Sequence, residues 1–349
     1  MNKHFTTYVS LLSAIYNHNK EKVAKSDRTK VGRHSLYGVS LDLDLSGNKL
    51  PVETTRKINP AISIGEMQWF MSGSNLIKDL KKLGGGSIWD SWTYVPHESD
   101  ESVKALIKTK TLKQQQEYHA SNKEHLPYSD HASIGPMYGQ VLRNSGYCEV
   151  DQLATCLTQI ITNPTSSRIC ATTWFPDLIP SSEKQQPWMN VANGEAALAP
   201  CHGSFIQFFV EDGALSLMMV QRSADVPVGL VHNITQYGFL LNYFAHITGL
   251  KTGMLMIRLG DAHIYADQMD MASTQIYREP TEYPVITFSK ETGEPFGNLA
   301  KLCAEMSGKD HIDYINMCAG YLDTINDGPI KYEVSPYQSH GEIKYPVAV

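Results

Sequence analysis

Residues 198–225 read LAPCHGSFIQFFVEDGALSLMMVQRSAD. Two apolar runs in this stretch are separated by the short segment EDG at 211–213, a pattern that predicts a tight β-hairpin. Cys201 precedes the first predicted strand, and Arg222 stands at the end of the second. A thiolate at Cys201 needs a positive neighbour, and Arg222 is the residue expected to supply it. Taken alone, Cys201 fits a buried structural cysteine better than a reactive one.

Patterns on either side of this stretch predict a mixture of strands and helices. Strands are expected at 36–45, 169–175, 204–210, 215–221 and 254–259. Helices are expected at 1–25, 62–70, 150–163 and 234–248. Glu66 lies in one of these helices among apolar residues, where a buried carboxylate is costly unless it has a partner or a task. Because strands and helices follow one another without a regular β-α-β rhythm, the predicted fold class is α+β.

Length and composition exclude several classes of protein. The 349 residues predict about two domains, and a hydrophobic content of 42% excludes general disorder. Charged residues make up only 19%, so long neutral stretches need a large core or a large partner surface. The net charge of −6 argues against a general nucleic-acid binder and leaves a small anionic ligand possible.

The sequence also favours a cellular location. No run approaches 18 consecutive apolar residues, so no membrane span is expected. The N-terminal segment is interpreted as a helix rather than a signal peptide. Six cysteines without C-x-x-C spacing favour reduced thiols in the cytoplasm.

Three segments differ from the rest in composition. Residues 94–131 are rich in Lys and Gln and are expected to form a solvated helical insertion. Residues 176–197 are expected to form a polar loop with three prolines. Residues 289–335 form a mixed tail for which the sequence indicates no mechanism beyond returning the C-terminus to the body of the protein.

A series of short motifs, in order along nearly the whole chain, resembles the thymidylate synthase family. The motifs are SDRT (26–29), GEMQWF (65–70), IWDSW (88–92), GPMYG (135–139), NPTSSRI (163–169), LAPCH (198–202), QRSAD (221–225), NI (233–234), AHITGL (245–250), GDAHIY (260–265), REP (278–280) and PVAV (346–349). One such motif alone is weak evidence for a family, but this many motifs in the same order make the resemblance specific.

The resemblance implies a fold and an assembly. The fold is a large twisted mixed sheet with flanking helices, and two copies pack sheet against sheet as a homodimer. It also implies one catalytic domain over 1–349, with insertions at about 94–131, 176–197 and 289–335, which replaces the estimate of two domains. The arginine matched by Arg168 reaches into the partner subunit's site.

The resemblance further implies a reaction. The family transfers a one-carbon unit from 5,10-methylenetetrahydrofolate, a co-substrate, to C5 of a pyrimidine nucleotide. Cys201 matches the nucleophile that adds to C6 of the base, Glu66 the acid and Tyr138 a residue that assists removal of the C5 proton. No metal and no DNA are implied.

The remaining site residues follow from the same motifs. The catalytic set comprises Cys201, Glu66, Tyr138, Asn233 and Arg222. The nucleotide-binding set comprises Arg28, Arg168, Gln221, Ser223, Asp225, His263, Tyr265 and His202. The folate-binding set comprises Trp89, Trp92, Asp225, Gly229, Lys57, Asn59 and Val349. Guanidinium groups suit phosphate oxygens, which is why the arginines are assigned to the nucleotide.

Asn233 indicates which base is bound. Its amide offers a donor beside an acceptor, which fits the acceptor oxygen and the adjacent N–H of uracil. Relatives that act on cytosine nucleotides carry Asp here, so dUMP is favoured over dCMP.

Departures from the family pattern leave the product open. Ser167 replaces one of two adjacent arginines, Asn59 a histidine, His232 an apolar residue and Gln236 a serine, and Lys30–Arg33 replace a glycine-rich stretch. Retained Trp89 and the terminal PVAV favour a dry site and methylation to dTMP. Polar His232 and Gln236 favour a held water and hydroxymethylation, an activity associated with phages that modify their DNA bases, in which case the location is the host cytoplasm. A relative that only binds nucleotide or RNA is the third alternative, and retention of Cys201 and Glu66 argues against it.

Overall fold

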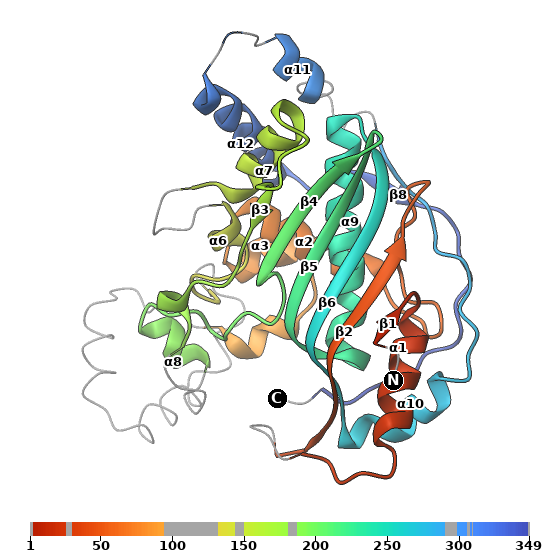
Figure 1. Cartoon of the computed structure of the whole chain (residues 1–349). Helices are drawn as coiled ribbons and strands as arrows, with labels where there is room; N and C mark the ends of the chain where they lie inside the picture. The colour runs from red at the N-terminus through yellow and green to blue at the C-terminus, as the bar shows by residue number, and fades with distance from the viewer. Residues whose placement is uncertain are drawn as a thin grey trace.

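A six-stranded mixed sheet forms the centre of the structure (Figure 1). The computed structural model describes residues 3–25, 30–93, 132–143, 150–180, 187–289, 299–305, 308 and 310–347. The strands are β1 (His4–Phe5), β2 (Arg33–Asp44), β3 (Cys170–Ala171), β4 (Phe205–Glu211), β5 (Ala214–Asp225) and β6 (Lys251–Tyr265). Their order is β1-β2-β6-β5-β4-β3, with parallel pairing at β1–β2 and β5–β6 and antiparallel pairing elsewhere. The mixed sheet expected from the sequence is therefore confirmed.

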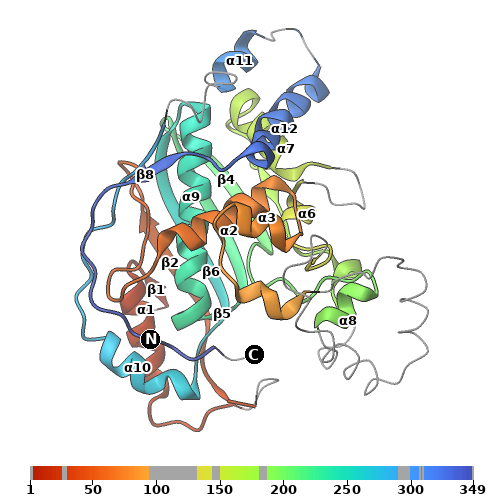
Figure 2. The same ribbon diagram turned by 180° about the vertical axis from the view of Figure 1, so that it is seen from behind.

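Helices pack on one face of this sheet. The longest is α9, which runs along the back of the sheet in Figure 2 with α2 beside it. The α-helices are α1 (Tyr8–Asn19), α2 (Pro60–Ser72), α3 (Ile77–Lys82), α6 (Gly139–Arg143), α7 (Gln152–Thr162), α8 (Pro187–Ala192), α9 (Val231–Thr248), α10 (Met269–Gln275), α11 (Leu299–Glu305) and α12 (His311–Asp327). Shorter helical turns are η1 (Ile88–Trp92), η3 (Pro176–Leu178), η4 (Val226–Leu230) and η5 (Ala266–Gln268). In the described ranges, no helix combines the length and apolar character needed to cross a bilayer.

The opposite face of the sheet is open to the viewer in Figure 1. Successive residues of a strand point to opposite faces, and β5 shows this alternation clearly. Leu215, Leu217 and Met219 are fully buried, whereas Met218 and Val220 on the other face are partly exposed. The sheet therefore has one face in the core of the chain and one partly exposed face, with both apolar and polar side chains, that the described helices leave uncovered.

The β4–β5 hairpin confirms the prediction made from its turn. Glu211 pairs with Ala214, and the two residues between them have positive φ angles, 49° at Asp212 and 73° at Gly213. Positive φ at both central residues is the geometry of a two-residue hairpin turn that matches strand twist. The hairpin places the start of β4 beside the end of β5.

Several predicted boundaries were wrong. The N-terminal helix spans only Tyr8–Asn19, because Thr7 accepts a hydrogen bond from Ser10 N (3.3 Å) and caps it, while β1 precedes it. Of the strand predicted at 169–175 only β3 is a strand, since the chain turns where Trp174 N donates to Thr172 Oγ1 (3.0 Å).

The outlying segments are also more ordered than expected. The polar loop predicted at 176–197 contains η3 and α8, so it is partly helical. The tail predicted at 289–335 contains α11, α12 and strand β8 (Tyr332–Val334), which pairs with β7 (Ile286–Phe288) in a second sheet. The insertion predicted at 94–131 lies outside the described residues.

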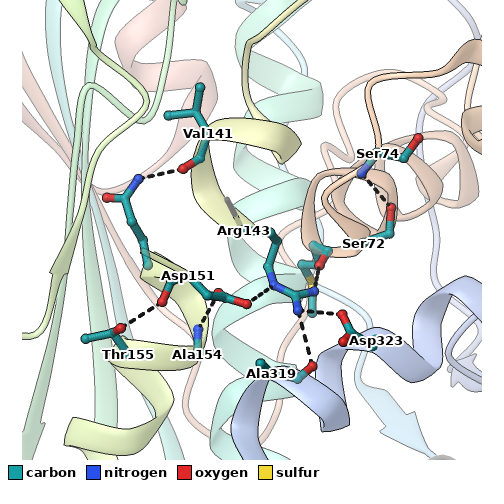
Figure 3. Close-up of polar contacts among 11 residues, drawn as sticks. Ser72, Ser74, Val141, Arg143, Asp151, Ala154, Thr155, Ala319 and Asp323 are labelled. Atoms are coloured by element: carbon teal, nitrogen blue, oxygen red, sulfur yellow. Dashed lines mark hydrogen bonds and ion pairs between the residues drawn. The ribbon is translucent and has the colours of Figure 1, made fainter. Parts of the chain in front are cut away.

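A buried arginine connects the tail to the body of the protein (Figure 3). Arg143, at the end of α6, donates to Met71 O of α2 (2.6 Å) and to Asp151 Oδ2 before α7 (2.7 Å). It also donates to Asp323 Oδ1 (2.7 Å) and Ala319 O (3.2 Å), both on α12. A buried guanidinium is tolerated when its donors are satisfied in this way. Arg143 therefore fixes α12 against three elements of the body.

Candidate active site

Cys201 and Arg222 meet at the end of the β4–β5 hairpin. Arg222 N donates to Cys201 O (2.9 Å), and Arg222 Nη2 lies 3.8 Å from Cys201 Sγ. The guanidinium is held in place by Ala199 O, 3.1 Å from Nη2, and by Pro200 O, 3.3 Å from Nε. A fixed positive charge beside a thiol favours the thiolate. The juxtaposition expected from the sequence is therefore present.

An open cavity lies on the other side of Arg222. Its volume is about 370 Å³, and it is lined by Thr172, Trp174, Ser204 and Arg222. The Arg222 guanidinium carbon lies 5.6 Å from the centre of the Trp174 ring, an arrangement in which a cation is attracted to the π face.

Tyr138 supports the Cys201 loop from the side of α6. Its Oη accepts a hydrogen bond from Cys201 N (3.0 Å). Its φ of 43° is uncommon for a non-glycine residue, and such strain persists only where surrounding contacts impose it. Those contacts include ring stacking on His202 (4.5 Å between centroids) and Phe70 (4.7 Å). Burial raises the pKa of Tyr138 well above its ordinary value, so the group stays a phenol.

His202 is part of the same buried stack. Its Nδ1 and Tyr237 Oη form a hydrogen bond of 3.0 Å. Burial lowers the pKa of His202 to about 3, so the ring is neutral at physiological pH. These contacts give His202 a structural role behind Cys201, while its assignment to nucleotide binding stays a prediction.

Glu66 projects from α2 into this region and has two hydrogen-bond donors. Trp89 Nε1 donates to Oε1, and Gln236 Nε2 donates to Oε2 (2.6 Å). Desolvation raises the pKa of Glu66 to about 7, against the opposing effect of the two donors. A carboxyl group with a pKa near 7 can both give and take a proton at neutral pH. The buried carboxylate therefore has hydrogen-bond partners, while its catalytic task stays a prediction.

Asn233 and Gln221 continue the hydrogen bonds that end on Glu66. Gln221 Nε2 donates to Asn233 Oδ1 (2.9 Å), and Asn233 Nδ2 donates to Gln236 Oε1 (3.0 Å). We refer to Gln221, Asn233, Gln236 and Glu66 as the amide relay. The sequence identified Gln236 as a departure from the family pattern and as a residue that favours a held water, and not as a neighbour of Glu66. The spacing of three between Gln236 and Asn233 on one helix was the signal that both lie on the same face.

Asp225 lies at the end of β5, where the C-terminal segment comes close. Its Oδ1 accepts from Val228 N (3.1 Å), and its Oδ2 accepts from Gln268 Nε2 (3.1 Å). Gln268 Nε2 also donates to Pro346 O (3.0 Å), so one amide connects Asp225 to the end of the chain. The β5–β6 register places His263 opposite Asp225, and the predicted binding roles of both residues stay predictions.

Further contacts fix the C-terminal segment. Arg56 donates to Ile343 O (3.1 Å) and to Pro227 O of η4, and its guanidinium carbon lies 4.8 Å from the Tyr345 ring centre. Tyr345 Oη donates to Gln275 Oε1 (2.7 Å). The segment therefore lies against the turn that follows β5.

The remaining predicted residues fall into three groups. Trp89 and Trp92 form an edge-to-face pair (5.4 Å) beside Glu66, and Ser223, Tyr265 and Gly229 lie on or next to the ends of β5 and β6. Arg28 and Val349 lie outside the described residues. The residues that the single chain leaves exposed, away from the amide relay, are Arg168, Lys57 and Asn59.

Two of these exposed residues have explicable positions. Asn59 Oδ1 accepts from Ala61 N (3.1 Å) and caps α2, so it has a local structural role whatever else it contacts. Arg168 lies on the loop before β3, the edge strand of the sheet, and the described residues of its own chain leave it exposed.

Comparison with known proteins gives a consistent result. A family model described as thymidylate synthase matches residues 6–349. The thymidylate synthase of Francisella tularensis subsp. holarctica (strain LVS) is 33% identical over 274 residues, 78% of this chain and 86% of its own length. The thymidylate synthase of Francisella philomiragia subsp. philomiragia is 31% identical over 289 residues, 83% of this chain and 90% of its own length. The chain belongs to the thymidylate synthase family and is one of its one-carbon methyltransferase enzymes.

Proposed function

We propose that this enzyme converts dUMP to dTMP by reductive methylation, with 5,10-methylenetetrahydrofolate as the co-substrate. The observation that carries the proposal is the thiol of Cys201 lying 3.8 Å from Arg222, on a loop that Tyr138 holds by a hydrogen bond. When bound, the folate supplies the one-carbon unit and the hydride. The acceptor chemistry of the Asp225 carboxylate suits the N–H groups of a pterin, and the two Trp rings suit its flat surface.

The residues of this chain have distinct tasks in the proposed reaction. The Cys201 thiolate forms a bond to C6 of uracil, and the electrons of the C5–C6 double bond move toward the O4 carbonyl oxygen, which makes C5 nucleophilic. Glu66, with a pKa of about 7, supplies the proton that stabilises the charge on that oxygen. Tyr138 lies next to the Cys201 loop, where it assists departure of the C5 proton. C5 forms a bond to the one-carbon unit, and the C5 proton leaves as the bond from that carbon to the folate nitrogen breaks. Hydride from the folate then adds to the resulting exocyclic carbon as the thiolate leaves C6, which restores the ring double bond.

We propose that Asn233 selects uracil. After its two hydrogen bonds within the amide relay, the amide keeps one lone pair on Oδ1 and one N–H on Nδ2. Uracil presents an N–H and an acceptor oxygen side by side, so it can use both the remaining lone pair and the remaining N–H of the amide. Cytosine presents a different order of donors and acceptors at the same edge.

We propose a homodimer that packs through the open face of the sheet. Partly exposed apolar side chains on that face, including Phe205, Phe209, Met218 and Met256, support it, since monomeric proteins rarely expose large apolar patches. The exposure of Arg168, on the loop before the edge strand β3, supports its assignment to the phosphate of the partner subunit's nucleotide. We take the whole chain, 1–349, as one catalytic domain that works in the cytoplasm on free nucleotide and needs neither DNA nor a membrane.

Hydroxymethylation is the second candidate, and one observation favours it. His232 introduces a polar ring beside Asn233, and its Nδ1 forms a hydrogen bond of 2.8 Å with Ser63 Oγ. Such a group is suited to hold a water near C5. Methylation is better supported, because Gln236 uses both ends of its amide within the protein and the C-terminal segment is held against the site. The names of the relatives point the same way.

A single-turnover experiment read by mass spectrometry tests the proposal. With dUMP and methylenetetrahydrofolate, we expect a methylated nucleotide together with dihydrofolate. A hydroxymethylated nucleotide with tetrahydrofolate establishes the second candidate. A covalent complex with 5-fluoro-dUMP and folate, absent in Cys201→Ser, separates both from a protein that only binds nucleotide or RNA.

A further inference from the structure

The side chain of Gln236 lies between Asn233 and Glu66. Its side chain is 1% exposed, and both ends of its amide have partners on different elements. Oε1 accepts from Asn233 Nδ2 on its own helix (3.0 Å), and Nε2 donates to Glu66 Oε2 on α2 (2.6 Å). Gln236 therefore connects Asn233, which we propose reads the base, to Glu66, which we propose moves a proton.

The hydrogen bonds of the amide relay all run in one direction. An ionised carboxylate only accepts, so the group that Gln236 turns toward Glu66 must be its NH₂. Its oxygen must then face Asn233, which in turn must present its NH₂ and keep Oδ1 for the Gln221 donor. Rotating any one amide by half a turn places two acceptors or two donors together, at a cost that burial increases.

We propose that Gln236 is a positioning residue that fixes the Asn233 amide in the orientation that reads uracil and couples that orientation to the ionisation of Glu66. The identity of the base rests on the proposed function, but the coupling itself does not. It is a property of four side chains in the protein without substrate.

Glu66 has a pKa shifted close to neutrality. Other charged and titratable groups also surround the relay. They come from α9, from the loop before α6 and from the β4–β5 region: His232, Tyr237, Tyr138, His202, Cys201 and Arg222. Desolvation lowers the pKa of His232 to about 4 and that of His202 to about 3. Burial raises the pKa of Tyr138 and of Tyr237 beyond the physiological range.

An infrared titration of the substrate-free enzyme tests the coupling directly. The stretching band of a protonated carboxyl, assigned by its loss in Glu66→Gln, reports the ionisation of Glu66 as a function of pH. We expect Gln236→Leu to raise the midpoint by about one pH unit, because a donor to the carboxylate is lost. Gln236→Ser retains a hydroxyl and room for water, so we expect a smaller rise.

A matched control separates this effect from general damage. Asn242 is another buried amide on α9, and it donates to Lys49 O and Gly238 O, away from the relay. We expect Asn242→Leu to lower thermal stability while leaving the Glu66 midpoint unchanged. If Gln236→Leu does not fold, the same comparison is made between Gln236→Ser and wild type.

The orientation of Asn233 is tested by the ratio of kcat/KM for dUMP to that for dCMP. We expect this ratio to fall about tenfold in Gln236→Leu, because the Asn233 amide can then rotate. An unchanged midpoint in the Gln236 variants overturns the coupling, and an unchanged ratio overturns the orienting role. If wild type proves inactive on dUMP, the proposed function fails while the infrared result still decides the coupling.

Discussion

At the scale of single residues, Glu66 has the property with the clearest consequence for pH dependence. Its pKa in the folded enzyme is about 7, above the value of about 4.3 for an exposed glutamate. The folded state therefore retains a proton that the unfolded state has already lost between these two pH values. Stability consequently falls as the pH rises through this window and does not change further above it.

The first prediction concerns Glu66→Gln. This variant lacks the titration, so its free energy of unfolding relative to wild type should rise between pH 5 and pH 8, by up to about 3 kcal/mol. Urea unfolding at the two pH values measures the difference. The same variant should lose most of its turnover. A constant difference between the two proteins at both pH values contradicts the assignment of a raised pKa.

The second prediction concerns Asn233→Asp. A carboxylate has no donor for Gln236 Oε1, so the relay must reverse at this point and the remaining acceptor faces the base. We expect the preference to move toward dCMP by about tenfold or more, with lower total activity. Competition between the two nucleotides, analysed by mass spectrometry, measures the ratio. Full retention of dUMP selectivity contradicts the proposed role of Asn233.

The candidate site was predictable from sequence to the extent that local spacing determined it. The turn at 211–213 sets the hairpin, and the hairpin brings Arg222 to Cys201. The contact of Trp89 and Gln236 with Glu66 was not predictable, because three separate elements must pack before those side chains meet. Pattern alone could identify Glu66 as unusual but could not supply its partners.

At the scale of elements, the number of neighbouring strands explains where the strand boundaries predicted from the sequence were wrong. The strand predicted at 254–259 extends over Lys251–Tyr265, because β6 lies between β2 and β5. Both neighbours continue the pairing through the polar Asp261 and His263, and β2 continues it to Tyr265. β3 lies at the sheet edge with one partner, so an apolar run predicted as a strand pairs over only two residues. The hydrophobic pattern reports burial and cannot report how many neighbours a strand has.

The third prediction belongs to the contact between α12 and the body of the protein. Asp151 and Asp323 both accept from Arg143 at 2.7 Å, but their side chains are 15% and 61% exposed. We expect Asp151→Ala to cost about 2–4 kcal/mol, because it removes a buried partner and the cap of α7. Asp323→Ala should cost about 1 kcal/mol or less.

Urea unfolding of the two variants under the same conditions provides the comparison. The chemical change and the distance to Arg143 are matched, so the difference reports the burial of Asp151 together with its cap of α7. Equal losses contradict the view that Asp151 is the main anchor of Arg143. Circular dichroism of each variant checks that both remain folded before unfolding is interpreted.

At the scale of the whole molecule, the shortage of charge noted in the composition has a structural counterpart. Uncharged stretches of β4 and β5, at 205–210 and 214–221, supply both the core beneath α9 and part of the open face in Figure 1. An uncovered face of this kind, with partly exposed apolar side chains, is suited to a second copy of the same sheet. The net charge of the chain says little about the ligand, because a few arginines set the local field.

The fourth prediction tests whether two chains share each site. Arg168→Ala and Cys201→Ala should each be inactive alone, the first because phosphate is held poorly and the second because the nucleophile is missing. After the two variants are mixed and allowed to exchange subunits, one site of each mixed dimer has both residues, so activity should return to about a quarter of wild type. Sedimentation confirms the dimer. No recovery in mixtures that do exchange subunits contradicts the shared site.

The position of Pro346 has a consequence for how this protein is synthesised. Gln268 donates hydrogen bonds to both Asp225 and Pro346, and Arg143 donates to Ala319 and Asp323. Ala319, Asp323 and Pro346 all follow Cys201 and the β4–β5 hairpin in the sequence, so a nascent chain carries its thiol before these contacts can form. A chain truncated before Pro346 keeps its nucleophile and lacks the contact of Gln268 with Pro346.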